Sequence, residues 1–268
     1  MTSDNKGLDR VLRTLLSERP EYSQIAIPST LRGKRDLLRS LMNVRAPKPL
    51  DDEIMALQDR ELAEQREEKG VVHLDSIKPS PIYPRLRLWQ GDITRLAVDA
   101  IVNAANCKML GCFIPMHKCI DNAIHSAAGM ELREECHNLM EKQGHDEPTG
   151  KAKITRGYNL PADWVIHTVG PIVYGPEPTE DDCRLLADCY RNCLELADRK
   201  GLKSIAFCCI STGEFRFPQR EAAEIAVATV RDYLASNPGT SVGTVVFNVF
   251  KDTDYYIYKE LLGYEKDI

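Results

Sequence analysis

The sequence predicts a layered α/β domain that follows a helical extension. From residue 85 onward, short apolar stretches typical of strands alternate with longer stretches of helical periodicity. Before residue 80, apolar residues recur only at helical spacing. We therefore divide the chain into a helical extension, residues 1–80, and an α/β domain, residues 85–268.

The extension is expected to contain two or three helices. Helical spacing is clear in two apolar sets, and the stretch "DDEIMALQDRELAEQREEK" resumes it, with Asp51 or Asp52 as its cap. The segment 78–84, "KPSPIYP", has three prolines and is predicted to be a linker without regular structure. The basic residues are interrupted by Asp36, which favours a solvated helix face made of Arg32, Lys34, Arg35 and Arg39.

Strands and helices alternate in the second part. Five strands are predicted, the first with one exposed face and the others mostly buried: 85–93, 98–106, 163–171, 203–213 and 242–250. Four helices are predicted, and the first is expected to run unbroken to a glycine: 120–144, 179–201, 219–239 and 252–263.

Composition limits the function. The 268 residues carry a net charge of −5, which argues against general nucleic-acid binding. No apolar run approaches the ~20 residues needed to cross a bilayer, and the charged start does not resemble a signal peptide. We expect a soluble cytoplasmic protein without a membrane partner. Nine scattered cysteines do not suggest a disulfide framework.

Cys112, His117 and Cys119 form a C-x4-H-x-C pattern after the stretch "NAAN". Thiolate and imidazole are zinc ligands, and a site with three protein ligands keeps a position for water or substrate. Cys107 is a candidate fourth ligand, which would close the site and make it structural. From spacing alone, small buried cysteines beside an ordinary histidine remain an equal alternative.

The other histidines and cysteines have simpler interpretations. His125 lies in a helix rich in small residues and is expected to be packed, and His167 lies inside a buried strand. Cys136 and His137 have no third ligand nearby, which favours a surface helix face.

Three predicted strands end in unusual loops, and such sheets bind ligands at the carboxyl ends of their strands. "STGEF", residues 211–215, offers consecutive backbone N–H groups that suit a diphosphate. Asn106 is suited to a sugar hydroxyl, and Asp92 to an exocyclic amine. Taken singly, each is explained equally by turn chemistry.

Together these motifs resemble the macrodomain family, which binds ADP-ribose. The resemblance rests on "QGDIT" (90–94), "DAIVNAAN" (99–106), "IDNAIHSAAG" (120–129), "GKAKITRGYNLPADWVIHTVGP" (150–171) and "ISTGEFRFP" (210–218). The stretch "CKMLGCFIPMHKC" stands where most members are glycine-rich, which is similar to the zinc-containing branch of protein-ADP-ribose hydrolases. The extension resembles that branch too. Asn122 stands where many macrodomains have glycine.

The resemblance implies a three-layer α/β/α domain with a mixed sheet of about six strands. It implies Zn²⁺ held by Cys112, His117 and Cys119, and catalytic roles for Asn106, Asp121 and Cys119. The implied ADP-ribose-binding residues are Asp92, Ile93, Asn106, Cys119, Ile120, Asp121, Ser211, Thr212, Gly213, Glu214 and Phe215.

The expected function is zinc-dependent hydrolysis that removes mono-ADP-ribose from a modified protein side chain, by cleavage at the anomeric carbon of the distal ribose. The implied partners are an ADP-ribosylated protein, with a lipoylated carrier protein as one candidate, and ADP-ribose itself. The alternatives are a reader that binds without cleaving, a structural zinc module, and a hydrolase of a small ADP-ribose derivative.

Overall fold

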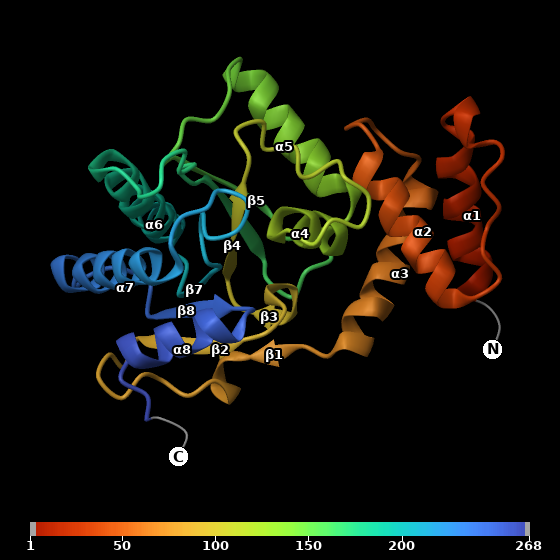
Figure 1. The fold of residues 1–268 in the computed structure, drawn as a ribbon. Helices are drawn as coiled ribbons and strands as arrows, with labels where there is room; N and C mark the ends of the chain where they lie inside the picture. The colour runs from red at the N-terminus through yellow and green to blue at the C-terminus, as the bar shows by residue number, and fades with distance from the viewer. Residues whose placement is uncertain (1–3, 266–268) are drawn as a thin grey trace.

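The computed structural model describes residues 4–265 and contains a six-stranded sheet with helices on both faces (Figure 1). The strand order is β2-β8-β7-β4-β6-β5. All neighbouring strands are parallel except β5, which runs antiparallel to β6 at one edge. The sheet is therefore mixed, as the family resemblance implies. The strands are β2 (Leu86–Gln90), β4 (Ala100–Ala105), β5 (Ala152–Arg156), β6 (Trp164–Val169), β7 (Ser204–Phe207) and β8 (Thr244–Val249).

The helices form two layers around this sheet. In Figure 1, α6, α7 and α8 cover one face, and α4 and α5 cover the other. The predicted three-layer α/β/α arrangement is thus confirmed. The helices are α4 (Ile120–Ala128), α5 (Met130–Gln143), α6 (Glu180–Lys200), α7 (Gln219–Ser236) and α8 (Asp252–Leu261).

Sequence patterns explain most of these elements. Strands β4, β6 and β7 are buried on both faces and read as apolar runs, as expected for parallel strands covered by helices. Helix α6 is capped at its start by Thr179, whose hydroxyl forms a reciprocal capping box with Asp182, and at its end by Gly201 in the left-handed conformation. Strand β5 was not among the predicted strands, because its short pattern has only one buried residue, Thr155.

The predicted single helix over 120–144 is wrong, because Gly129 divides it into α4 and α5. Gly129 has φ 108° and ψ 177°, outside the helical region, and its N–H still donates to the carbonyl of His125 at 3.2 Å. A Cβ at this position would lie 2.8 Å from Glu131 Oε2 and 2.9 Å from Gln58 Nε2. The break changes the chain direction at the point where a helix of the extension packs.

The extension forms three helices, as predicted, and they lie beyond α4 in Figure 1. Asp51 caps the third by accepting from the N–H groups of Glu53 and Ile54. These helices share a hydrophobic cluster of their own, which also includes Met130 from α5. The position of the boundary between the two parts stays a prediction. The helices are α1 (Asp4–Ser17), α2 (Leu31–Val44) and α3 (Asp52–Lys69).

Small elements join the extension to the sheet domain. Strand β1 (Val72–His73) pairs in parallel with β3 (Leu96–Ala97). The predicted linker 78–84 follows and contains no helix or strand, although Pro79 forms a single bridge to Arg87. Three short 3₁₀ turns complete the elements of residues 4–265: η1 (Pro20–Tyr22), η2 (Leu74–Ser76) and η3 (Ile93–Arg95).

The predicted solvated face of basic residues on α2 is wrong for three of its four members. Lys34 is buried and lies 2.6 Å from Asp9 of α1. Arg35 pairs with two glutamates of α3, and Arg39 reaches α4. Only Arg32 is fully exposed, with 94% of its side chain accessible. Residue types alone did not reveal that α2 lies between two packed elements.

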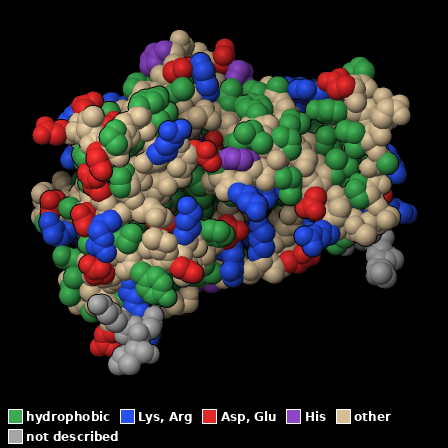
Figure 2. Space-filling model, viewed as in Figure 1, with side chains coloured by type: hydrophobic (Ala, Val, Ile, Leu, Met, Phe, Trp, Pro, Cys, Tyr) green, Lys and Arg blue, Asp and Glu red, His purple; other side chains and the backbone are tan. Residues whose placement is uncertain are grey.

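Figure 2 shows Lys and Arg side chains intermingled with Asp and Glu over much of the visible surface. Within residues 4–265, no helix combines the length and the apolar character that a bilayer-spanning segment requires.

The extension and the sheet domain meet at a buried polar seam. Gln58 of α3 is fully buried, accepts from the N–H of Met130 at 2.9 Å and donates to Glu131 Oε2 at 3.0 Å. Gln58 also donates to Asp59, which accepts from Asn159 at 2.7 Å. Burial, with the neighbouring Asp59 carboxylate, raises the pKa of Glu131 to about 7.

Glu131→Gln should remove a pH-dependent loss of stability. In the unfolded chain a Glu loses its proton near pH ~4.3, whereas folded Glu131 keeps it to about pH 7. The folded state binds more protons in this window, so the free energy of unfolding of the wild type falls as pH rises through it. Denaturant titrations from pH 4.5 to 8 should show the variant gaining about 2–3 kcal/mol relative to wild type.

Glu141→Gln is the matched control, because Glu141 lies on the same helix and is exposed. It should follow the wild type at every pH. A constant difference between Glu131→Gln and wild type over the whole range would contradict the raised pKa.

Candidate functional site

The three predicted site loops follow β2, β4 and β7, which are mutually parallel. Their carboxyl ends therefore lie at one edge of the sheet, where such folds bind ligands. Strands β4 and β7 are neighbours, whereas β8 and β7 separate β2 from β4. Three inter-strand spacings place Asp92, after β2, roughly 14 Å along this edge from Asn106, after β4.

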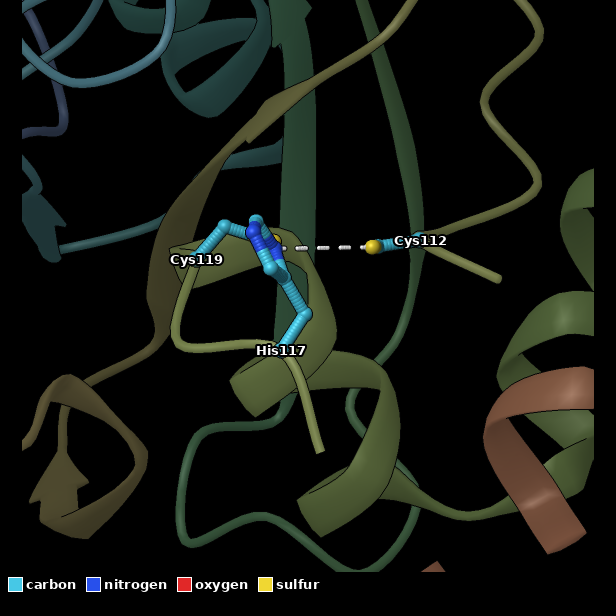
Figure 3. A group of neighbouring side chains, drawn as sticks. All are labelled: Cys112, His117 and Cys119. Carbon is cyan, nitrogen blue, oxygen red and sulfur yellow. Dashed lines mark hydrogen bonds between the residues drawn. The ribbon is translucent and has the colours of Figure 1, made fainter. Parts of the chain in front are cut away.

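Cys112, His117 and Cys119 converge in space, with their ligand atoms all within 4.8 Å of one another. Figure 3 shows Cys112 approaching from one side and His117 and Cys119 from the other. Cys112 Sγ lies 3.7 Å from His117 Nδ1. Cys119 caps α4, and its sulfur accepts from the N–H of Asn122 at 3.4 Å.

The donor chemistry of this group fits zinc. Burial, together with neighbouring Cys112, raises the pKa of the Cys119 thiol to about 12. Two thiols and one imidazole converging in a half-buried loop are the ligand types that Zn²⁺ binds, and a cation there would stabilise both sulfurs as thiolates. Within the described residues, this group has three members.

Cys107 does not join the group. It is exposed, and its sulfur donates to Asp146 Oδ2 at 3.5 Å. Among residues 4–265, no fourth His, Cys, Asp or Glu therefore joins the group to give the closed four-ligand alternative.

Asp121 lies in the first turn of α4, two residues after Cys119, and only 5% of it is exposed. Each carboxylate oxygen accepts from a different asparagine: Oδ1 from Asn103 at 2.8 Å and Oδ2 from Asn106 at 3.3 Å. Burial raises the pKa of Asp121 to about 6. The amides of Asn103, in β4, and Asn106, in the loop that follows, thus orient a carboxyl group beside the group of three candidate metal ligands (the metal group).

A buried histidine pair supports this carboxylate from behind. His125 Nε2 lies 3.5 Å from Asp121 Oδ1, and His167 Nδ1 lies 3.1 Å from the Asn103 amide nitrogen. Burial lowers the pKa of both rings, that of His167 to about 3, so both are neutral at physiological pH. His167 Nε2 lies 2.9 Å from Thr155 Oγ1. Both histidines are packed in the core, as predicted.

The predicted surface position of Cys136 is wrong. Cys136 is fully buried, its sulfur lies 3.7 Å from His167 Nε2, and it forms a second compact His/Cys group with His125 and His167. Since both nitrogens of His167 already have hydrogen-bonding partners, we assign this group to the core. The signal was present in the sequence: Leu132 is four residues earlier, on the same apolar face of α5.

In the loop after β7, residues at both ends form backbone hydrogen bonds, whereas the N–H groups in the middle form none with any residue that the structure describes. The N–H of Phe217 donates to the Ser211 carbonyl at 3.0 Å, and the N–H of Val173 donates to the Phe215 carbonyl at 2.9 Å. Ser211 has φ 66°, and its hydroxyl is buried without a partner among residues 4–265. Thr212 donates to the carbonyl of Cys209. The N–H groups of residues 212–215 bond to no backbone carbonyl in the described chain, which suits them to an anion.

The loop of residues 112–119, which carries Cys112, His117 and Cys119 and is called the metal loop below, lies close to the loop after β7. His117 Nε2 lies 4.0 Å from Glu214 Oε1. Glu214 is 78% exposed, so this contact shows proximity rather than a strong ion pair. Ile120 begins α4 and packs partly against the core. Asn106, Cys119, Asp121 and the 211–215 loop thus border one site.

Asp92 lies apart from the metal group, at the other end of the candidate site. Its Oδ1 accepts from the N–H and hydroxyl of Thr94, and its Oδ2 lies 3.7 Å from Lys69 Nζ of the extension. Ile93 is buried beneath it. A groove of about 220 Å³ between α2, α3 and α4 opens beside Asp92. No described contact links Asp92 to the metal group, so any ligand that touches both is extended.

Three polar residues of this site were missed by sequence reasoning. Asn103 had a signal, because it is a polar residue inside an otherwise apolar buried strand. Arg39 and Asn43 had none, because their roles depend on how α2 packs against α4 and the metal loop.

The chain is similar to proteins of known family. The family model described as Macro domain matches residues 102–226. A protein-ADP-ribose hydrolase of Treponema medium is 50% identical over 257 residues, which are 94% of this chain and 97% of that protein. A protein-ADP-ribose hydrolase of Staphylococcus aureus (strain MRSA252) is 46% identical over 260 residues, 97% of this chain and 96% of that protein. The crystal structure of the Trypanosoma brucei macrodomain in complex with ADP-ribose is 32% identical, with a TM-score of 0.65 over 84% of this chain and 95% of that one.

Gly111→Ala should disturb this site. Gly111 has φ 79°, and a Cβ there would lie 2.9–3.0 Å from the ring of His125. Its carbonyl also accepts from the Asn106 side chain at 3.2 Å. We expect the free energy of unfolding to fall by about 1–3 kcal/mol in denaturant titrations, from backbone strain and the displaced imidazole.

Gly213→Ala is the control, because a Cβ there meets nothing within 4 Å and the backbone does not have the strained positive φ. It should change stability by less than about 0.5 kcal/mol. Equal effects of the two substitutions would show that the loop at Gly111 is not held against His125.

Proposed function

This chain belongs to the macrodomain family and is a protein-ADP-ribose hydrolase; from that premise we propose that it releases mono-ADP-ribose with a zinc ion held by Cys112, His117 and Cys119. The observation that carries the proposal is the position of this three-donor group. It ends at Cys119, two residues before the oriented carboxylate of Asp121, and it faces the loop at residues 211–215.

The proposed ligand extends along the sheet edge. Asp92 and Ile93 contact the adenine end. The amides of residues 211–215 hold the diphosphate, because they follow a strand and have no backbone acceptors in the described chain. Asn106 and the start of α4, including Cys119, Ile120 and Asp121, border the distal ribose. The positive end of the α4 dipole also favours a negatively charged ligand nearby.

The proposed reaction breaks the bond between the anomeric carbon of the distal ribose and the oxygen or nitrogen of the modified side chain. Charge develops on the sugar as the side chain departs, as in other glycoside cleavages. Water adds to the anomeric carbon, and the products are free ADP-ribose and the unmodified side chain. A bound zinc ion supplies Lewis acidity beside the sugar.

Asp121 receives the proton that the attacking water loses, and that proton is then available to the departing side chain. Asn103 and Asn106 each donate to one of its oxygens, so its orientation is set before substrate arrives. Asn106 lies near enough to the start of α4 to hold a ribose hydroxyl. Water is excluded from the inner side of the carboxylate by the buried rings of His125 and His167.

Removal of metal should abolish hydrolysis. We expect the release of ADP-ribose from a mono-ADP-ribosylated protein to fall at least ~100-fold after treatment with a strong chelator, and to return on addition of Zn²⁺. The release of ADP-ribose by the Cys119→Ala variant should fall by a similar factor, and added Zn²⁺ should not restore it. Cys107→Ala is the matched control and should keep wild-type activity, since Cys107 lies outside the donor group. Full turnover by protein verified to be metal-free would refute the zinc-assisted reaction.

Asp121→Asn should separate catalysis from binding. The variant keeps a side chain of the same shape and one of the two oxygens that accept from Asn103 and Asn106, but it cannot accept the proton, so we expect release to slow ~100-fold or more. The Kd for free ADP-ribose, measured by calorimetry, should change less than about tenfold. Wild-type protein that binds ADP-ribose but releases none from a modified protein would instead support the non-catalytic reader.

A further inference from the structure

The metal loop has no regular secondary structure between Cys112 and Cys119, and residues 113–116 are exposed. Met116, directly before His117, has φ 56°, a conformation that is uncommon and costly for a residue with a side chain. Such a conformation persists only when its surroundings determine it. A local turn, closed by the N–H of His117 donating to the Ile114 carbonyl at 3.3 Å, places Met116 in this conformation, and helix α2 of the extension contacts the turn on both sides of His117.

Asn43 of α2 contacts the loop on one side of His117. Its Oδ1 accepts from the N–H of Met116 at 3.0 Å, and its amide nitrogen donates to Ser126 Oγ of α4 at 2.9 Å. Asn43 is only 1% exposed, so both hydrogen bonds are shielded from water. Loss of either partner would leave a buried polar group unsatisfied.

Arg39 contacts the loop on the other side. Its Nη2 donates to the carbonyl of His117 at 3.1 Å and to Asn122 Oδ1 at 2.7 Å. The Asn122 amide nitrogen in turn donates to the Ile114 carbonyl at 3.0 Å. A planar guanidinium can bridge two acceptors in this way, whereas a lysine offers a single charged centre.

Arg39 and Asn43 are four residues apart and therefore share one face of α2. Together they bind the Met116 N–H and the His117 carbonyl, the backbone groups just before and just after the Cα that carries the His117 side chain. We propose that α2 positions His117 for metal binding, with Arg39 and Asn43 as its positioning residues. This inference rests on the proposed function, since it assigns the extension a role at the same metal group.

The competing explanation is that Arg39 and Asn43 only attach the extension to the sheet domain. It predicts lower stability without a specific effect on the donors. Arg35 tests this difference. It lies on the same helix and bonds to Glu61 and Glu68 of α3, entirely within the extension. Arg32, exposed on α2, is a second control.

The experiment measures zinc affinity by competition with a chromophoric chelator, together with thermal stability, for the full chain. Arg39→Ala and Asn43→Ala should weaken zinc binding about 10–100-fold, the usual effect of removing a group that orients a metal ligand. Arg39→Lys should recover part of this loss. Arg35→Ala should lower the melting temperature but bind zinc within about threefold of wild type, and Arg32→Ala should change neither.

A second readout reports geometry directly. Cobalt(II) loaded in place of zinc has visible bands that depend on the arrangement of its ligands. Arg39→Ala should alter the relative intensities and positions of these bands, whereas Arg35→Ala should keep the wild-type spectrum.

The outcomes separate the two proposals. If Arg39→Ala and Asn43→Ala lower only stability and keep wild-type zinc affinity and cobalt spectrum, the positioning role is wrong while the hydrolase mechanism stands. If wild-type protein binds zinc but its turnover is indifferent to metal, the mechanism is wrong while the positioning role stands. Wild-type protein without affinity for zinc overturns both.

Discussion

The buried carboxyl group of Asp121 is the constraint around which the site is organised. A carboxylate removed from water is unfavourable unless donors satisfy it. Here Asn103 and Asn106 supply those donors, which explains why a polar residue interrupts the apolar strand β4. The position in the first turn of α4 adds the favourable field of a helix N-terminus. The neutral rings of His125 and His167 lie behind it and separate the carboxylate from the apolar core.

The extension is part of this arrangement. Helix α2 contacts the metal loop and α4, and Arg133 of α5 returns the contact by donating to the carbonyls of Met42 and Arg45. Arg133 also donates to the Leu110 carbonyl and lies over the ring of Phe113, so it holds the start of the same loop. An irregular loop that bears ligands is thus enclosed between regular elements, and its geometry depends on both parts of the chain.

Much of this could be predicted from the sequence, because strand and helix patterns are local. The alternation of strands and helices and the loops at the strand ends follow from periodicity and turn residues. The group of Cys112, His117 and Cys119 was implied by the family resemblance, because donor spacing alone left small buried cysteines as an equal alternative. The break at Gly129 was not predictable from periodicity, since the apolar pattern continues through it. The role of Arg39 was equally hidden, because a charged residue on a helix looks solvated until its tertiary neighbours are known. The zinc ion and the ADP-ribose contacts stay predictions.

The order of the strands has one more consequence. Asp92 and Asn106 follow β2 and β4, and the two hydrogen-bonded strands between them, β8 and β7, set the span. The strand order therefore fixes the distance between these two residues along the sheet. If Asp92 and Asn106 bind opposite ends of the ligand as proposed, a molecule with the right chemical groups but the wrong length reaches only one of them, and the strand order then selects ligands by length.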